Sequence, residues 1–450
     1  MISILMPVYN VSKYLEKTAA SLKAQTFGDF EVIMVDDGST DGSGLICDKI
    51  AEEDARFRVI HQPNAGVSAA RNAALDEVRG EYIYFLDGDD LLLPETFEEM
   101  LALLNDNAAD FVTARLSYID DDGNAIEKLN KLSPVKDEIL TGEEYLHKLT
   151  KENSQFYCTS TNKLFKAALF EGVRYPVGRV NEDEARIHEV VYKAKKIVST
   201  GKAYYFYLKH SGSITTAPFT LRSLDRDEAF GDRLSFYVEK CLCALSAEMF
   251  VYAVSELKKT LNKSLRYGIY GEAKERLLRI AKKDAALGER IGDDTPEMKA
   301  ASSCLAAIIG LADAFPKVYG TYLGDIADDG KNEPSVDIAK DYAEAKLIQF
   351  VAGKGYSDFA VASAMDELKS RATLTFIHTV KKGMYHGENK KKLLEIFRIE
   401  YPLAAKTQDP TPEQKQVLAV SSAVCKAPWL YAAYIRLREK VSPIPVPEEY

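Results

Sequence analysis

The chain has 450 residues, of which 46% are hydrophobic and 10% aromatic. This composition excludes disordered and collagen-like proteins, and the length predicts roughly two to four domains. The formal net charge is −10, and residues 1–220 carry 24 basic against 35 acidic side chains, so the excess acidity lies in the first half. Because an acidic surface repels phosphates, we expect no nucleic-acid partner.

Cysteine content and hydropathy predict the compartment. Six cysteines without a Cys-x-x-Cys pair are too few for a disulfide framework. The apolar start of the chain lacks the basic leader of a signal peptide, and the longest apolar stretch, residues 300–314, is interrupted by Ser302, Ser303 and Asp313. We therefore expect a cytoplasmic protein with no transmembrane span, and peripheral contact with the inner face of the membrane stays open.

Residues 1–120 alternate between strand and helix patterns. Short apolar runs predict strands at residues 2–6, 30–35, 57–60, 82–86 and 110–112, and the segments between them have helical periodicity. Four consecutive β-α units predict an α/β fold, with a mostly parallel sheet and helices on both faces. Ligands bind beyond the carboxyl ends of such strands, so the polar residues that follow each strand are the first candidates for chemistry.

From about Leu224 onward the pattern is helical. One buried stripe is predicted on a long helix by apolar residues at every fourth position, which are Leu245, Met249, Ala253, Leu257, Leu261 and Leu265. Breaks rich in Gly and Asp at 288–296 and 328–335 are typical of linkers. We predict an α/β domain over residues 1–222, a helical region over 223–330 and a second helical domain over 331–450.

The second predicted strand runs into the sequence Val35-Asp36-Asp37-Gly38-Ser39-Thr40-Asp41. Two adjacent carboxylates followed by Gly and small hydroxyls form a turn with open backbone donors. The same residue types are good helix N-caps. By itself this motif is equally consistent with a binding turn and with a simple cap.

The fourth predicted strand runs into Phe85-Leu86-Asp87-Gly88-Asp89-Asp90. Three carboxylates within four residues repel one another and are costly to hold together without a cation. Asp87 and Asp89 alternate on an extended segment and point the same way, whereas Asp90 points oppositely and is expected to support the turn or cap a helix. We predict a divalent cation shared with diphosphate oxygens, with a solvated acidic loop as the alternative.

A third motif, Asn64-Ala65-Gly66-Val67-Ser68-Ala69-Ala70-Arg71-Asn72, opens a predicted helix. Free amides at a helix start favour an anion, and Arg71 lies one turn into the helix, where its side chain could reach that anion. An ordinary surface arginine is the alternative.

These three motifs, with Met6-Pro7-Val8-Tyr9-Asn10 and Gln25-Thr26-Phe27-Gly28-Asp29-Phe30-Glu31, closely resemble the family 2 glycosyltransferases, which are inverting enzymes of the GT-A fold. The resemblance covers roughly residues 1–215. It implies a Rossmann-like GT-A catalytic domain with a mostly parallel sheet, followed here by an all-α C-terminal region. It also implies a nucleotide-sugar donor, most often a UDP-sugar.

The resemblance implies roles on the donor side. Pro7 and Tyr9 would line the base and ribose pocket, Asp37 would bond the uracil edge, and Asp36 would brace that loop. Arg71 would face the nucleotide. The full set implied to bind the nucleotide sugar is Pro7, Tyr9, Asp36, Asp37, Asn64, Arg71, Asp87 and Gly88.

The resemblance also places a metal. Asp87 would contact the ribose or the donor sugar, and Asp89 would ligate Mn²⁺ or Mg²⁺. Residues 204–215 resemble the aromatic-basic segment that closes the family's catalytic domain, but His210 stands where many relatives carry Arg. A His here is similar to the metal-binding His of many GT-A proteins, and imidazole is a competent Mn²⁺ ligand. Contact with diphosphate, or plain packing, is the alternative.

On the acceptor side, Asn162-Lys163-Leu164 resembles the family's Asn-Lys-Leu segment, and Asn181-Glu182-Asp183-Glu184 resembles its Glu-Asp motif. By this resemblance Asp183 would be the general base and Glu182 would position the acceptor. Without the resemblance, the acidic run is more typical of a solvated helix start.

We therefore expect a metal-dependent inverting glycosyltransferase, hexosyl or N-acetylhexosaminyl, acting in bacterial surface polysaccharide or teichoic-acid synthesis. Its acceptor would be a saccharide, a polyol phosphate, a lipid-linked molecule or a protein. The alternatives are a polyol-phosphate transferase on the same scaffold, and a non-catalytic binding protein whose helical half mediates assembly. The helical region is also a candidate surface for a homo-oligomer.

Overall fold

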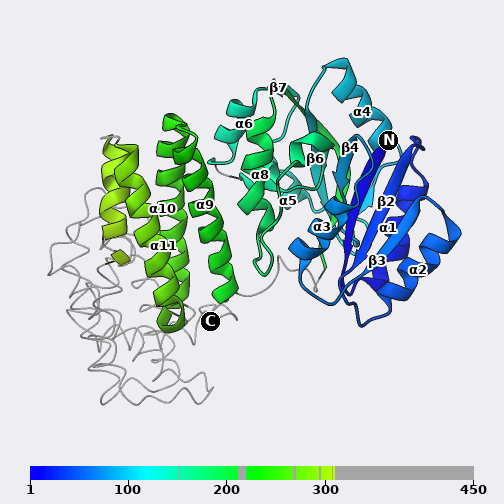
Figure 1. The fold of residues 1–450 in the computed structure, drawn as a ribbon, viewed down its shortest axis with the longest axis horizontal. Helices are drawn as coiled ribbons and strands as arrows, with labels where there is room; N and C mark the ends of the chain where they lie inside the picture. Colours follow the sequence, from blue (N-terminus) through cyan, green and yellow to red (C-terminus); the bar gives the residue numbers. More distant parts are fainter. Residues whose placement is uncertain (152, 211–218, 267–269, 293–294, 307, 310–450) are drawn as a thin grey trace, which may run out of the picture. The chain divides into compact units, whose positions relative to one another are not determined.

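The computed structural model describes residues 1–151, 153–210, 219–266, 270–292, 295–306 and 308–309 (Figure 1). The chain divides into two compact units, Met1–Ala253 and Val254–Tyr450. The first unit contains the sheet and every predicted site residue.

The first half of the sheet is parallel. Its strands lie in the order β3-β2-β1-β4, with bounds β1 (Ile2–Val8), β2 (Phe30–Asp36), β3 (Phe57–His61) and β4 (Tyr82–Phe85). All seven residues of β2 are buried. A strand covered on both faces needs a continuous apolar run, which is the pattern that predicted it.

The second half of the sheet is mixed. It contains β5 (Leu91–Leu92), β6 (Phe111–Ile119), β7 (Glu138–Leu140), β8 (Lys163–Lys166) and β9 (Ile197–Leu208). Strand β8 lies antiparallel between β4 and β6, β9 runs parallel to β6, and β5 and β7 run antiparallel to β9. Six of the nine strands in the described residues run in one direction, so the predicted mostly parallel sheet is confirmed.

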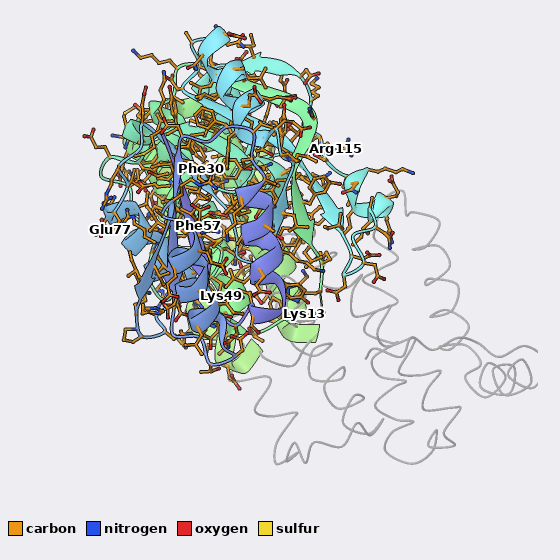
Figure 2. The ribbon with its side chains drawn as sticks, turned by 90° about the vertical axis from the view of Figure 1, so that its right-hand side faces the viewer. Lys13, Phe30, Lys49, Phe57, Glu77 and Arg115 are labelled. Carbon is orange, nitrogen blue, oxygen red and sulfur yellow. The ribbon has the colours of Figure 1, made fainter. Side chains whose placement is uncertain are left out.

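One face of the sheet is covered by α1 (Ser12–Lys23), α2 (Ser43–Glu53) and α4 (Thr96–Asp106). Figure 2 shows α1 and α2 side by side, with Lys13 and Lys49 labelled on them, and Lys49 pairs with Glu16 of α1 at 3.2 Å. Phe97 of α4 packs against the rings of Phe30 and Tyr84, with centroids 5.9 and 5.2 Å away.

The opposite face is covered by α3 (Val67–Asp76), α6 (Gly142–Lys148) and α8 (Glu182–Lys193). Phe85 follows Tyr84 on β4 and therefore points to this face. Its ring lies 5.3 Å from Phe170 and 5.9 Å from Tyr175, and Tyr145 of α6 packs on Phe111 at 5.3 Å. Helices on both faces confirm the predicted architecture. Short connectors are α5 (Glu127–Asn130), α7 (Gln155–Cys158), η1 (Ala167–Phe170) and η3 (Leu221–Leu224).

Helix α9 (Asp225–Glu239) packs against α8 through a buried ion pair. Arg233 is fully buried and donates to Glu184 Oε2 at 2.5 Å, to the Glu184 carbonyl at 2.9 Å and to the Leu149 carbonyl at 3.1 Å. The first compact unit includes this helix and ends at Ala253, whereas the sequence-based division at residue 222 assigns α9 to the helical region. The boundaries 1–222, 223–330 and 331–450 stay predictions.

The helical region contains α10 (Cys243–Arg266) and α11 (Tyr270–Ile291), and residues 296–306 are also helical. The predicted stripe on α10 is confirmed at its described positions, where Leu245, Met249, Ala253, Leu257 and Leu261 are at most 7% exposed. The C-terminal domain predicted over residues 331–450 lies outside the described residues. In the part of the chain that the structure describes, no helix is both long and apolar enough to cross a membrane.

The Arg233–Glu184 pair gives a prediction about stability. Replacing the buried arginine in Arg233→Met leaves the Glu184 carboxylate buried without its partner, so we expect stability to fall by about 3–5 kcal/mol. Urea unfolding followed by circular dichroism measures the loss. The double variant Arg233→Met, Glu184→Gln should recover part of it, and exposed Arg222→Met should change stability by less than about 0.5 kcal/mol. Equal losses at the two arginines would contradict the assignment.

Candidate active site

Four predicted site residues meet at the guanidinium of Arg71. This side chain of α3 is 3% exposed, and its Nη1 donates to Glu182 Oε1 at 2.7 Å and to Asp183 Oδ1 at 2.8 Å. Its Nη2 donates to Asp87 Oδ1 at 3.2 Å. The guanidinium carbon lies 5.7 and 5.6 Å from the ring centres of Phe85 and Tyr175. One buried cation therefore links the loop after β4 to the start of α8.

The loop before α3 is held by hydrogen bonds, and it sets the position of Arg71 on the helix. The Asp37 carboxylate, 3% exposed, accepts hydrogen bonds from Gln62 Nε2 at 2.6 Å, Ala65 N at 2.9 Å and Gly66 N at 2.7 Å. Gly66 has φ +89°, a backbone conformation that other residues rarely adopt. The carboxylate at the end of β2 thus braces the loop from which Arg71 projects.

The neighbouring carboxylate braces a second turn. Asp36 is 6% exposed and accepts hydrogen bonds from Ser39 N and from His61 Nδ1, both at 3.0 Å. Burial opposes ionisation of Asp36, but these hydrogen bonds outweigh it and lower the pKa of its carboxyl. The turn after β2 is therefore held by an ionised side chain.

The acidic start of α8 is favoured by the helix itself. Asn181 precedes the helix in the left-handed conformation, and Glu182, Asp183 and Glu184 occupy the first turn, where the helix dipole stabilises negative charge. Asp183 Oδ1 also accepts a hydrogen bond from Ser160 Oγ at 2.5 Å. Asp183 and Glu184 thus face different partners, since Glu184 binds Arg233.

Three carboxylates on one guanidinium leave an excess of negative charge in a buried place. Burial alone would lower the pKa of Arg71, but Asp183, Glu182 and Asp87 raise it well above its usual value. Burial raises the pKa of Asp87, although the Arg71 guanidinium opposes the rise. Burial also raises the pKa of Glu182 to about 7, although the Arg71 guanidinium again opposes the rise. Burial thus makes the charged forms of Asp87 and Glu182 costlier, and the Arg71 guanidinium offsets part of this cost.

The other two carboxylates of the loop after β4 face elsewhere. Asp89 Oδ2 lies 2.9 Å from Nε2 of His210, and the ring of Tyr14 packs against His210 at a tilt of 35°, with centroids 4.7 Å apart. Asp90 is 1% exposed and accepts from Tyr205 Oη at 2.5 Å and Leu208 N at 2.8 Å. Asp90 therefore ties this loop to β9, and of the two predicted roles, supporting the turn or capping a helix, these contacts agree with the first.

The Asp89–His210 pair is chemically suited to Mn²⁺, which accepts both carboxylate oxygen and imidazole nitrogen. Both side chains are partly shielded, at 21% and 11% exposure. Within the described ranges, however, no group of three or more His, Cys, Asp or Glu side chains is placed to hold a metal ion. A cation bound here would need oxygen atoms from water or from a bound anion to complete its coordination.

The remaining predicted residues surround the same ends of the strands. Gly88 is buried next to the end of β1. The space there is tight, since a Cβ atom at this position would lie 3.3 Å from the Pro7 carbonyl oxygen and 3.2 Å from Val11 Cγ2. Tyr9 is 49% exposed, and Asn64 is also exposed, in the loop that Asp37 braces. These positions leave the Tyr9 ring and the Asn64 amide accessible to a ligand.

Sequence reasoning missed two residues that the structure brings to Asp183. Ser160 binds Asp183 directly, and Tyr175 binds Ser160 at 2.7 Å. Neither residue carries a chemical pattern of its own in the sequence. The one available signal was the position of Ser160, two residues before the Asn162-Lys163-Leu164 segment.

The strand order, the helices on both faces of the sheet and the acidic residues beyond the strand ends define an α/β domain of the GT-A type, followed by helices. Residues 3–174 match the model of the family described as Glycosyl transferase family 2. Glycosyltransferase GlyG of Streptococcus pneumoniae serotype 4 is 35% identical over 272 residues, which are 58% of this chain and 89% of GlyG. The chain belongs to glycosyl transferase family 2.

Two further similarities extend the comparison. The minor teichoic acid biosynthesis protein GgaB of Bacillus subtilis is 31% identical over 218 residues, which are 47% of this chain but 23% of GgaB. The crystal structure of S. aureus TarS 1–349, in complex with UDP-GlcNAc, superposes with a TM-score of 0.54 at 22% identity and covers 73% of this chain and 94% of that one. At this identity the likeness supports the fold.

The raised pKa of Glu182 predicts a pH-dependent stability difference. The folded protein holds a proton on Glu182 up to about pH 7, whereas the unfolded chain releases it near pH 4.5. Folding therefore loses stability through this group as the pH rises between those values. The variant Glu182→Gln has no ionisable group at this position and so does not lose this stability as the pH rises. Its stability relative to the unmodified protein should therefore rise by about 1–3 kcal/mol between pH 5 and pH 8.

Urea unfolding at a series of pH values measures this difference. Glu16→Gln is the matched control for the same substitution at the surface, because Glu16 is 65% exposed on α1, and its stability should differ from that of the unmodified protein by less than about 0.5 kcal/mol. A pH-independent difference for Glu182→Gln would contradict the proposed protonation.

Proposed function

We propose that the protein is a metal-dependent inverting glycosyltransferase that moves a sugar from a UDP-sugar to an acceptor hydroxyl. The observation that carries the proposal is the Arg71 cluster, in which Asp183 lies beside Asp87 at the carboxyl ends of the strands. Family membership supports sugar transfer, and the UDP-GlcNAc complex of TarS supports a UDP-sugar donor. The name of GgaB supports a role in teichoic-acid or surface polysaccharide synthesis.

The donor would lie across the ends of β1, β2 and β4. The exposed ring of Tyr9, next to Pro7, would stack on the base. A carboxylate offers about four lone pairs, and Asp37 uses three of them on the loop that precedes α3, so one is left for the uracil edge. Asp36 and Asn64 would shape this pocket, and Asp87 and Gly88 would approach the ribose and the sugar.

The acceptor hydroxyl would attack the anomeric carbon from the face opposite the diphosphate. A hydroxyl is a weak nucleophile at neutral pH, so a carboxylate must take its proton as the bond forms. Asp183 would be this base and Glu182 would position the acceptor, and their shared contact with Arg71 supports the assignment. No covalent sugar intermediate is needed. The acceptor class, whether saccharide, polyol phosphate, lipid-linked molecule or protein, depends on groups beyond this cluster.

Charge on the leaving diphosphate grows as the sugar departs. Asp89 and His210 would hold Mn²⁺ or Mg²⁺, and the ion would supply electrostatic stabilisation to the diphosphate. Arg71 already binds three carboxylates, so its contribution is to hold Asp87 and Asp183 at a fixed separation across the site.

The general-base role predicts a specific kinetic defect. Asp183→Asn keeps the size of the side chain but cannot accept the proton, so we expect kcat to fall by about 10²–10⁴ with the KM for the donor nearly unchanged. UDP release from a panel of UDP-sugars measures both constants. Asp29→Asn, at a position 68% exposed at the opposite end of β2, is the matched control and should keep full activity. Near-normal kcat in Asp183→Asn would remove Asp183 from the role.

The metal role is tested separately by binding. Calorimetry with UDP in the presence and absence of Mn²⁺ should show tighter binding with the ion in the unmodified protein. In Asp89→Ala the ion should no longer raise the affinity, because a ligand of the cation is missing. Asp29→Ala should keep the effect of Mn²⁺. An unchanged response in Asp89→Ala would place the cation elsewhere.

A further inference from the structure

We infer that Ser160 and Tyr175 form a hydrogen-bonded chain that positions Asp183 and leaves its Oδ2 as the atom that takes the proton of the acceptor. The inference rests on the proposed function, because it assigns positioning residues to the proposed general base. It adds two residues to the site and a role for the Asn162-Lys163-Leu164 segment, which the proposed mechanism does not use.

The two hydroxyls are buried and directly linked. Ser160 is 1% exposed and Tyr175 is 3% exposed. Ser160 Oγ lies 2.5 Å from Asp183 Oδ1, and the Tyr175 hydroxyl lies 2.7 Å from Ser160 Oγ. A buried chain of this kind persists because each polar atom in it would be costly to leave unpaired.

The direction of the chain follows from counting protons. An ionised carboxylate only accepts, so the single hydroxyl proton of Ser160 goes to Asp183. Ser160 has no second proton, so it can only accept a hydrogen bond from Tyr175. Tyr175 is therefore the donor to Ser160. Burial raises the pKa of the Tyr175 hydroxyl, and neighbouring Asp183 raises it further, so the tyrosine keeps this proton. The chain therefore runs from Tyr175 through Ser160 to Asp183.

Among the described residues, every donor to the Asp183 side chain binds the same oxygen. Arg71 Nη1 and Ser160 Oγ both donate to Oδ1, at 2.8 and 2.5 Å. From the described part of the chain, no donor reaches Oδ2. Two donors on Oδ1 restrain rotation of the carboxylate, while the side chain as a whole keeps 17% exposure. Oδ2 is thus the oxygen with lone pairs available to an acceptor hydroxyl.

The segment around Asn162 holds Ser160 in place. Lys163 is fully buried, and its Nζ donates to the Thr159 carbonyl at 2.6 Å and to Asn162 Oδ1 at 2.9 Å. Asn162 has φ +58°, and its side chain donates to the Ala114 carbonyl of β6 at 2.5 Å. The turn before β8 is therefore tied to the sheet on both sides of Ser160.

Tyr175 is held from the helix that carries Arg71. The side-chain amide of Asn72 donates to the Tyr175 carbonyl at 2.9 Å, and its oxygen accepts from Tyr175 N at 2.8 Å. Consecutive residues of α3 therefore fix both donors of Asp183 Oδ1, Arg71 directly and Ser160 through Tyr175. The titratable groups that face Asp183 are Arg71, Asp87, Glu182, Tyr175, Lys163 and Cys158.

A double-mutant cycle on the full-length protein tests the chain. Ser160→Ala removes the donor to Asp183, so kcat for the best UDP-sugar should fall about 10- to 100-fold, the scale of one hydrogen bond to a charged group. Tyr175→Phe keeps the ring and should lower kcat by about 2- to 10-fold. Because Tyr175 acts only through Ser160, the double variant should have the kcat of Ser160→Ala within about twofold. The KM for the donor should stay unchanged throughout.

A second readout needs no turnover. The carboxyl ¹³C signal of Asp183, assigned by its loss in Asp183→Asn, reports ionisation as a function of pH. Removing a hydrogen bond from the charged form favours the protonated form, so the midpoint should move to higher pH in Ser160→Ala. Tyr175→Phe should move it in the same direction by less. If no UDP-sugar is turned over, the proposed function fails, while the titration still decides whether the chain exists.

Matched controls separate positioning from general stability. Ser199→Ala and Tyr145→Phe each remove a buried hydroxyl that bonds a backbone carbonyl outside the site, Lys136 O and Tyr157 O respectively. Both should lower the melting temperature without changing kcat or the Asp183 midpoint. Additive kcat losses for Ser160 and Tyr175, or a midpoint that does not move in Ser160→Ala, would overturn the inference.

Discussion

The buried guanidinium of Arg71 is the interaction on which the arrangement of this site depends. A cation removed from water needs compensating charge, and here it comes from Asp87 and from Glu182 and Asp183, which are 16, 111 and 112 residues away in the sequence. The loop after β4 and the start of α8 therefore take up their positions together. In the proposed reaction these two segments serve the donor and the acceptor, so one ion-pair cluster sets the distance between them.

A second buried arginine acts on the next residue of the same helix. Arg233 of α9 binds Glu184, while Arg71 of α3 binds Asp183, so adjacent carboxylates at the start of α8 are held by cations from different helices. Val180, just before α8, also donates its amide to Asp225 of α9 at 2.7 Å. The first helix after the sheet thus helps to support the proposed catalytic turn, which explains physically why it lies in the first compact unit.

Directional hydrogen bonds fix the orientation of the carboxylates that the ion pairs bring together. The electrostatic attraction of the Arg71 cation acts on both oxygens of a carboxylate. The hydrogen bond from the Ser160 hydroxyl, at 2.5 Å, is directional and is made to one oxygen of Asp183. The neighbouring pair of Asp36 and Asp37 shows the same combination, since backbone amides and His61 hold the two carboxylates in defined orientations. In this site, ion pairs bring the carboxylates together and hydrogen bonds set their orientation.

The sequence by itself determined the parallel half of the sheet and the places where chemistry should lie, whereas the strands of the mixed half, β5, β7, β8 and β9, were not predicted. Apolar runs such as Phe30–Val35 and residues 82–86 became strands because a strand buried on both faces requires a continuous apolar stretch, and the acidic motifs follow those strands directly. Only the tertiary structure decided that Arg71 is buried among three carboxylates, that Asp89 faces His210, and that Ser160 and Tyr175 reach Asp183. These contacts join residues up to 121 positions apart, and periodicity carries no information about pairings at that separation because they arise only when the chain packs.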